Sequence, residues 1–228
     1  MRTLNHSVIV PVLNGARYVR ECLDSILLQL GVEDELIVVD NGSTDGTQAL
    51  VKAYGDGRVV LLHQQSRGTA AARNAGLRWA RGRYVSFQDH DDLWPEGRQA
   101  KLLSAIVTTA GANAAHGRQR VIFDGTPIAE HYAGMDGNYV FHHSIVSGMF
   151  ERSLLDRVGY LDETMGLVAD VDYLVRLRQA GMIAALCDAD VHIRRRHSHN
   201  SSSVSPATIR GDTLQIMRRN ILRLRGSK

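Results

Sequence analysis

The chain contains very little lysine. Lys52, Lys101 and Lys228 are the lysines among 228 residues, so nearly all of the 27 basic side chains are arginines. The formal net charge is only +3, and the basic residues are scattered except in the last fifth of the chain. Proteins that bind nucleic acid usually gather basic residues on one face. The charge pattern therefore argues against nucleic acid as a partner.

Cysteine is equally scarce, and long apolar runs are missing. Cys22 and Cys187 lie inside apolar periodic segments, so we expect buried thiols in a reducing compartment rather than a disulfide or a metal pair. No apolar run approaches the ~20 residues that a membrane span needs. The N-terminal run SVIVPVL leads straight into a helix pattern, without a signal-peptide cleavage site. These features predict a cytoplasmic enzyme.

Two common phosphate-binding motifs are also missing. No Gly-x-Gly-x-x-Gly follows the first predicted strand, and no Gly-x-x-x-x-Gly-Lys-Ser/Thr loop occurs. The sequence therefore argues against a dinucleotide-dependent dehydrogenase and against a P-loop kinase. Any bound phosphate would have to be held mainly by a metal ion and by basic side chains.

Strand and helix patterns alternate in the first half of the chain. Apolar runs rich in β-branched residues predict strands at 7–13, 35–40, 58–64 and 83–88. Helical periodicity predicts helices ending near Leu30, over 44–54 and over 68–80, with Asn14 as a cap for the first. This alternation indicates an α/β protein with a mostly parallel sheet.

The second half is less regular. Helices are predicted from Pro95 to about 110, over 153–158 and over 170–180, where Gly181 ends the helix. A hairpin is expected around Asp124-Gly125, and a strand over 182–197. We predict one domain: a binding half at about 1–95, a half completing the site at about 96–205, and a basic amphipathic helix at about 206–228. That helix would either dock on the domain or lie on an anionic membrane surface.

Three predicted strands end in polar sequence, namely PVLNG, VVDNGSTDGT and FQDHDD. The carboxyl ends of parallel strands form one edge of a sheet, where ligands bind. Five aspartates would gather at this edge, namely Asp40, Asp45, Asp89, Asp91 and Asp92. A lone Asp-x-Asp is more often a solvated acidic turn, but a divalent cation that takes oxygen ligands, such as Mn²⁺ or Mg²⁺, would stabilise crowded carboxylates. Three convergent strand ends favour such a metal site.

Four segments resemble the family 2 glycosyltransferases of the GT-A fold. They are SVIVPVLNGARYVRECLDSIL, ELIVVDNGSTDGT, ARNAGLRWARGRYVSFQDHDD and VGYLDETMGLVADVDYLVRL, and the resemblance extends from about Ser7 to about Ser201. It implies a GT-A-like, Rossmann-like sheet flanked by helices, with a mixed C-terminal half on the acceptor side. The implied activity is inverting transfer of a sugar from a UDP- or dTDP-linked donor to an acceptor hydroxyl, with Mn²⁺ or Mg²⁺ as cofactor.

The resemblance assigns donor-binding roles. Asp40 would accept the N3–H of uracil or thymine, since a carboxylate offers only acceptors, and Asp89 would bind the ribose. The alternatives are a turn cap for Asp40 and an exposed helix position for Arg73. The residues implied for the nucleotide are Pro11, Val12, Asn14, Asp40, Arg73 and Asp89.

Metal and base roles follow from the same resemblance. Asp91 would ligate the metal, with His197 as a second contact and His199 as its competitor. Asp170 would be the general base that takes the acceptor proton, or else only a helix cap. Ala169 replaces a glutamate common in relatives, which weakens this assignment.

The acceptor side is less defined. Ser147 and Gly148 would let the acceptor approach closely, with His142 and His143 either beside them or packed elsewhere. Asp92 would support the turn or contact the sugar. The sequence leaves four classes of acceptor open, namely a saccharide, a lipid-linked glycan, a peptide and a small molecule. Membrane association through the last helix is also an open alternative. The competing functions are a non-catalytic nucleotide-sugar-binding subunit and a metal-dependent nucleotide-sugar hydrolase.

Overall fold

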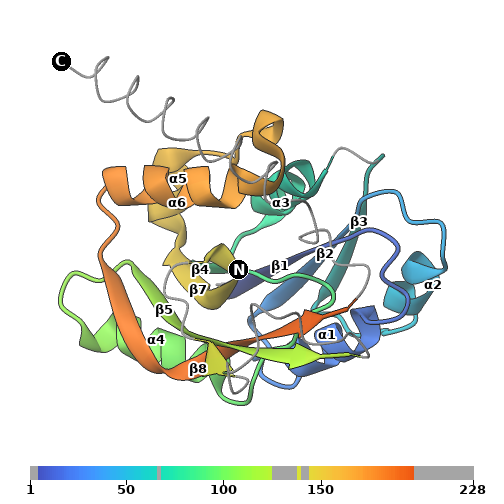
Figure 1. The fold of residues 1–228 in the computed structure, drawn as a ribbon, viewed down its shortest axis with the longest axis horizontal. Helices are drawn as coiled ribbons and strands as arrows, with labels where there is room; N and C mark the ends of the chain where they lie inside the picture. Colours follow the sequence, from blue (N-terminus) through green and yellow to red (C-terminus); the bar gives the residue numbers. More distant parts are fainter. Residues whose placement is uncertain (1–4, 66–67, 125–137, 140–143, 198–228) are drawn as a thin grey trace.

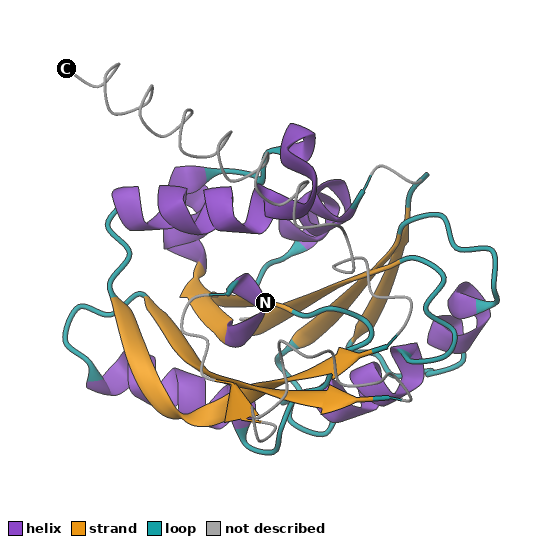
Figure 2. Cartoon of the chain, in the orientation of Figure 1, coloured by secondary structure: helices purple, strands orange, loops and turns teal. Residues whose placement is uncertain are grey.

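A computed structural model describes residues 5–65, 68–124, 138–139 and 144–197 of the chain. A central sheet lies between two sets of helices, as Figures 1 and 2 show. Helices α3, α5 and α6 cover one face, and α1 and α4 lie on the other. The α/β class predicted from the sequence is confirmed.

The first half alternates strands and helices as predicted. Its elements are β1 (His6–Val12), α1 (Val19–Leu27), β2 (Glu35–Asp40), α2 (Thr47–Lys52), β3 (Val59–His63), α3 (Thr69–Trp79) and β4 (Tyr84–Phe87). Asn14 does not cap α1, because it lies five residues before Val19 with a φ of 51° and the N-cap position belongs to Tyr18. That sequence prediction was wrong.

The second half contains a short antiparallel strand at 148–151 that the sequence pattern did not reveal. Its elements are α4 (Arg98–Thr108), β5 (Ala114–Phe123), β6 (Asn138–Tyr139), the 3₁₀ turn Ile145–Ser147, β7 (Gly148–Glu151), α5 (Arg152–Val158), the 3₁₀ segment Glu163–Val168, α6 (Ala169–Gln179) and β8 (Ala184–Arg196). Gly181 follows α6 with a φ of 88°, in the position expected for a glycine that ends a helix. Most of the predicted hairpin, and the predicted helix at about 206–228, lie outside the described residues.

The described strands form one sheet in the order β3-β2-β1-β4-β7-β5-β6, and β8 pairs with β5. Strands β3, β2, β1 and β4 are parallel, whereas β7 is antiparallel to both β4 and β5. The chain order reverses between β1 and β4, which is the point at which α/β sheets bind ligands beyond their carboxyl ends. The topology therefore directs attention to the ends of β1, β2 and β4.

Strand alternation divides the apolar core between the two faces of the sheet. On β1, Ile9 packs with the core under α3, α5 and α6, whereas Val8 and Val10 pack with Cys22 and Leu23 of α1. Successive side chains of a strand point to opposite faces, so a continuous apolar run serves both layers. This explains why β1 and β2 are buried along their whole length.

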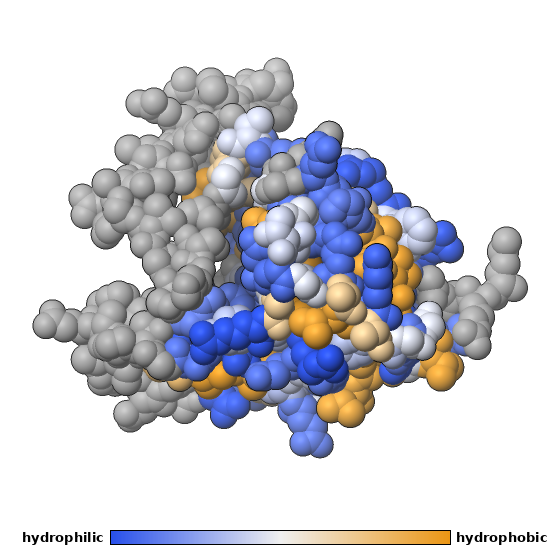
Figure 3. All heavy atoms as spheres, turned by 90° about the vertical axis from the view of Figure 1, so that its right-hand side faces the viewer, coloured by the Kyte–Doolittle hydropathy of each residue, from blue (hydrophilic) through white to orange (hydrophobic). Residues whose placement is uncertain are grey.

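The edge strand β3 is only partly covered. Its residues 59–62 are half-buried, because β2 is its one partner in the sheet among the described strands. Figure 3 faces this side of the molecule and shows apolar and hydrophilic side chains intermixed. No helix in the described part of the chain combines the length and apolar character needed to cross a membrane.

Candidate active site

Asp40 ends β2 and is completely buried. Its carboxylate accepts hydrogen bonds from Ser43 N at 3.1 Å, Gln48 Nε2 at 2.6 Å and His63 Nδ1 at 2.8 Å. Burial opposes ionisation, but the hydrogen bonds from Ser43, His63 and Gln48 lower the pKa of Asp40 on balance. Asp40 is thus held as an ionised acceptor at the carboxyl edge of the sheet.

The sequence did not identify His63 and Gln48 as partners of Asp40. His63 ends β3 and is in register with Asp40 on the neighbouring strand. A histidine at the end of a predicted parallel strand therefore indicated a possible neighbour of Asp40 at the same edge of the sheet. Gln48 reaches Asp40 from α2, and its direction depends on how that helix packs.

The turn after β1 is bound to the turn after β2. Pro11 and Val12 are buried at the end of β1, and Asn14 Oδ1 accepts a hydrogen bond from Thr44 N at 2.8 Å. Asp45 accepts from Ala16 N at 3.0 Å and from Thr47 N at 3.1 Å. These contacts make the two turns a single rigid rim beside Asp40.

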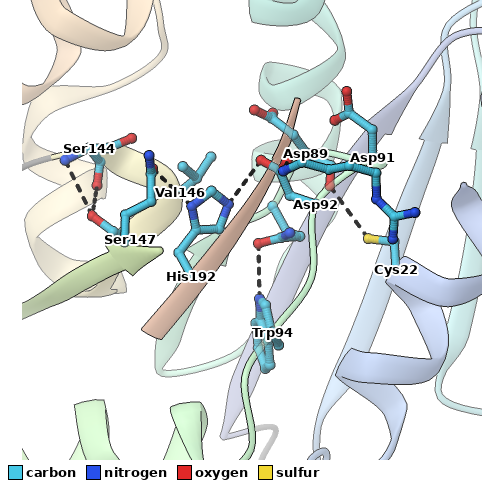
Figure 4. A network of polar contacts seen from close by, with 12 residues as sticks. Cys22, Asp89, Asp91, Asp92, Trp94, Ser144, Val146, Ser147 and His192 are labelled. Carbon is cyan, nitrogen blue, oxygen red and sulfur yellow. Dashed lines mark hydrogen bonds and ion pairs between the residues drawn. The ribbon is translucent and has the colours of Figure 1, made fainter. Parts of the chain in front are cut away.

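The carboxylates of the acidic segment after β4 point in different directions. Figure 4 shows the side chains of Asp89 and Asp91 on one side of the chain, and Asp92 directed toward His192. Asp92 is buried, accepts from Arg195 N at 2.7 Å, and lies 3.0 Å from His192 Nε2. Burial raises the pKa of Asp92, although His192 opposes the shift. Both carboxylate oxygens of Asp92 thus face interior groups and connect this segment to β8.

Other contacts hold the backbone of the acidic segment. Cys22 Sγ of α1 donates to the carbonyl of Asp89 at 3.4 Å. His90 packs against Gly15, where an added Cβ would lie 2.5 Å from His90 Cδ2. His90, the residue between Asp89 and Asp91, therefore fills space that only a glycine at position 15 leaves open.

Asp91 and His197 are brought together from distant parts of the chain. His197 Nε2 lies 3.0 Å from Asp91 Oδ2, across 106 positions of sequence. The imidazole also stacks on Tyr18, with ring centroids 4.6 Å apart. The rival residue His199 lies outside the described residues, as do His142 and His143.

Asp91 and His197 present two donor atoms that a divalent metal ion could share. Adjacent ligands of an octahedral ion at about 2.1 Å lie about 3 Å apart, which is the separation of Asp91 Oδ2 and His197 Nε2. No third metal-ligating side chain joins them in the part of the chain that the structure describes. An ion with few protein ligands, completed by water and phosphate oxygens, is typical of Mg²⁺ sites. The pair therefore fits a divalent cation bound together with a phosphate ligand.

Arg73 of α3 joins two carboxylates from distant segments. Its Nη2 donates to Asp89 Oδ1 at 2.7 Å, and its Nη1 donates to Asp170 Oδ1. The Arg73 side chain is 4% exposed, whereas the side chains of Asp89 and Asp170 are 40% and 31% exposed. Two acidic groups thus face the open side while the cation lies behind them.

The pKa values of the two carboxylates move in opposite directions. Burial raises the pKa of Asp170, against the lowering effect of Arg73. For Asp89, burial also opposes ionisation, but the charge of Arg73 lowers its pKa on balance. Separated pKa values in neighbouring acids are typical of sites where one acid moves a proton and the other binds.

Asp170 and Asp172 face different directions on α6, as their spacing predicts. Asp172 is buried and pairs with Arg176 Nε at 2.8 Å. Asp170 is turned toward Arg73 and Asp89. Of the two, Asp170 alone is in contact with the other predicted site residues.

Ser147 and Gly148 lie in the interior. The Ser147 hydroxyl donates to Ser144 O at 3.1 Å, and neither residue is exposed. A Cβ on Gly148 would lie 2.7 Å from the ring of Phe150 and 2.9 Å from that of His116. In this structure the space left by the glycine is used by protein side chains.

The chain forms a Rossmann-like α/β fold with a cluster of aspartates at the topological switch point. Residues 7–161 match the model of the glycosyl transferase family 2. The chain therefore belongs to glycosyl transferase family 2, as the resemblance predicted.

Two curated relatives illustrate the similarity. Glycosyltransferase GlyA of Streptococcus pneumoniae is 32% identical over 158 residues, which cover 68% of this chain and 21% of GlyA. The putative teichuronic acid biosynthesis glycosyltransferase TuaG of Bacillus subtilis is 36% identical over 125 residues, covering 54% of this chain and 50% of TuaG. The matched part of the chain thus spans between about a fifth and a half of these relatives.

Solved structures share the fold. S. aureus TarS in complex with UDP-GlcNAc superposes with a TM-score of 0.74 at 20% identity, over 93% of this chain and 65% of the TarS chain. The mannosyltransferase PcManGT of Pyrobaculum calidifontis, in complex with GDP-Man and Mn²⁺, superposes with a TM-score of 0.67 at 25% identity. The match covers 88% of this chain and 59% of the PcManGT chain. The GT-A-like fold expected from the sequence is confirmed.

Proposed function

We propose that the protein transfers a sugar from a uridine or thymidine diphosphate donor to an acceptor hydroxyl, with inversion at the anomeric carbon. Family membership and relatives named as glycosyltransferases support the transferase class. Structural neighbours in complex with UDP-GlcNAc and with GDP-Man and Mn²⁺ support a nucleotide-sugar donor. The pyrimidine preference rests on Asp40, whose acceptor-only carboxylate suits the single N3–H donor of uracil or thymine.

One observation carries the proposal. Arg73 connects Asp89, at the end of the parallel half, to Asp170, which lies 97 positions after the arginine. A donor bound along Asp40, Asp89 and Asp91 would therefore lie next to a second, separate carboxylate. Inverting transfer needs this combination, because one group must hold the donor while another accepts a proton.

The proposed reaction exchanges one bond for another. The bond between the anomeric carbon and the diphosphate oxygen breaks, and a bond between the anomeric carbon and the acceptor oxygen forms. Asp170 receives the acceptor proton, and the nucleoside diphosphate leaves with the bonding electrons. A cation held by Asp91 and His197 would offset the negative charge of that leaving group. Asp89 binds the ribose and keeps the donor in place.

The nucleotide is tested first. Thermal unfolding is measured with UDP, dTDP, GDP, CDP and ADP, each with Mn²⁺ or Mg²⁺, because a ligand of the native state stabilises it according to its concentration relative to Kd. We expect the largest stabilisation from UDP or dTDP with metal. Sugar donors of the best nucleotide are then combined with saccharide, lipid-linked, peptide and small-molecule acceptors.

The product decides between the candidate functions. We expect transfer to an acceptor with the anomeric configuration opposite to that of the donor, as read by NMR. Release of free sugar from the donor alone, faster than any transfer, would identify a hydrolase. Nucleotide-sugar binding without turnover in any combination would instead identify a binding subunit. The association of the last helix with membranes and the cytoplasmic location remain predictions from the sequence.

A further inference from the structure

We propose that Arg73 is a positioning residue that holds the general base Asp170 in place by sharing one guanidinium between Asp170 and Asp89. The inference rests on the proposed function and changes the role expected for Arg73, since the family resemblance implied contact with the nucleotide. It makes Arg73 the connection between the donor-binding half and the base.

Burial is the first argument. The Arg73 side chain is 4% exposed, while the side chains of Asp89 and Asp170, which it bonds, are 40% and 31% exposed. A ligand entering from the open side therefore meets Asp89 and Asp170 before it can meet Arg73. A group in this position is suited to support other side chains rather than to bind substrate itself.

The geometry of the bonds is the second argument. Nη1 and Nη2 each donate to a different carboxylate, while Nε is buried and has no hydrogen-bond partner among the described residues. The planar guanidinium fixes the angle between its two donors, so it also fixes the relative placement of the two acids. A lysine carries the same charge but cannot impose this fixed fork.

Charge is the third argument. Burial and the neighbouring charge of Asp89 both raise the pKa of Asp170, and Arg73 is the cation that opposes them. Among the described residues near this part of α6, Asp172 pairs with Arg176 and Glu163 accepts a hydrogen bond from Asn74. Removing Arg73 would leave Asp89 and Asp170 without the cation that they share.

The pH profile gives a readout that a merely structural role would not move. A base must be deprotonated to act, so kcat/KM falls as the pH drops through the pKa of Asp170. In Arg73→Gln this pKa should rise, and the acid limb of kcat/KM should shift to higher pH. In Arg73→Lys the charge remains, so the limb should stay near its wild-type position while kcat falls by about 10²-fold through misplacement of the base.

UDP binding separates this role from direct nucleotide contact. We expect calorimetric UDP dissociation constants within about tenfold of wild type in both variants, because Asp40 and the Asp89 side chain remain. An unmoved acid limb in Arg73→Gln, together with UDP affinity lowered a hundredfold or more, would overturn the inference and restore the nucleotide-binding role. Circular dichroism shows whether each variant folds. If Arg73→Gln does not fold, the inference is tested with Arg73→Lys alone. A wild-type kcat in Arg73→Lys would also overturn the inference.

Failure of the proposed function is recognised separately. Unfolding free energies of Arg73→Gln, Asp170→Asn and the double variant form a cycle that measures their coupling without any turnover. Coupling together with unchanged turnover in Asp170→Asn would overturn the base assignment, and with it the positioning role. Absence of coupling with turnover lost in Asp170→Asn would overturn the positioning role alone.

Discussion

His197 Nε2 lies 3.0 Å from Asp91 Oδ2, so β8 brings a histidine back to the acidic turn that follows β4. Asp91 lies 106 positions earlier in the chain, and no local pattern joins the two residues. Tyr18 of the segment before α1 stacks on the imidazole and restricts its orientation. The pairing therefore depends on three separate parts of the fold.

His197→Gln should weaken Mn²⁺ binding. Loss of a supporting group around a metal typically costs about 10–100-fold in affinity, and loss of a direct ligand should cost at least that much. Mn²⁺ is titrated without nucleotide and followed by electron paramagnetic resonance. His63→Gln serves as the matched control, because His63 contacts Asp40 rather than Asp91. Equal Mn²⁺ affinity in all three proteins would make His197 an ion-pair partner of Asp91 rather than a metal ligand.

Asp170→Asn should abolish most transfer while UDP still binds. A general base typically contributes about 10²–10⁴-fold to the rate, and the amide cannot take the acceptor proton. The measurements are kcat for transfer and the calorimetric dissociation constant for UDP. Asp156→Asn on α5 is the control, since that carboxylate is 65% exposed in a surface pair with Arg152. Wild-type turnover in Asp170→Asn would exclude this residue as the base.

The strands of the first half of the fold could be predicted from the sequence, whereas a strand of the second half could not. Strand β2 matches its predicted range, because an apolar run ends at Asp40 in a cluster of turn residues. Strand β7 was missed, since its place between β4 and β5 arises from pairings such as Val85 with Phe150 and Ala114 with Phe150. Short antiparallel strands of this kind are determined by distant partners rather than by their own four residues.

The site shows the same division. Aspartates at the ends of β2 and β4 could be predicted, because parallel strands end at a common edge. The cation shared by Asp89 and Asp170 could not, because Arg73 reaches Asp170 only after α3 and α6 have packed on the same face of the sheet. The direction of a side chain between two helices depends on tertiary packing, and the family resemblance had implied a nucleotide contact for Arg73.

Asp40→Asn should shift the nucleobase preference from uridine toward cytidine. The asparagine amide can donate to cytosine N3 and accept from its amino group, whereas a carboxylate accepts the N3–H of uracil but has no donor for cytosine N3. An unsatisfied buried polar group costs about 1–3 kcal/mol, so UDP affinity should fall roughly tenfold to a hundredfold. The ratio of UDP to CDP dissociation constants is the measurement.

The fold around Asp40 needs its own check. In Asp40→Asn, the new amide would face Gln48 and His63, which both contact the carboxylate in the native protein. Thermal unfolding without nucleotide therefore accompanies the binding data, with His63→Gln as the matched variant. A UDP to CDP ratio equal to that of the wild type in a folded Asp40→Asn protein would contradict base recognition by this residue.

Gly148→Ala should destabilise the protein by about 1–3 kcal/mol, the usual effect of overpacking a core. The new methyl group would lie 2.7 Å from Phe150 Cζ and 2.9 Å from His116 Cε1, and both rings are fully buried. Unfolding free energies from urea denaturation measure the effect. Gly57→Ala is the control, because no atom lies within 4 Å of its Cβ position and its φ is outside the left-handed region. A stable Gly148→Ala protein with a raised KM for the acceptor would instead restore the role that the sequence gave this glycine, namely close approach of the acceptor.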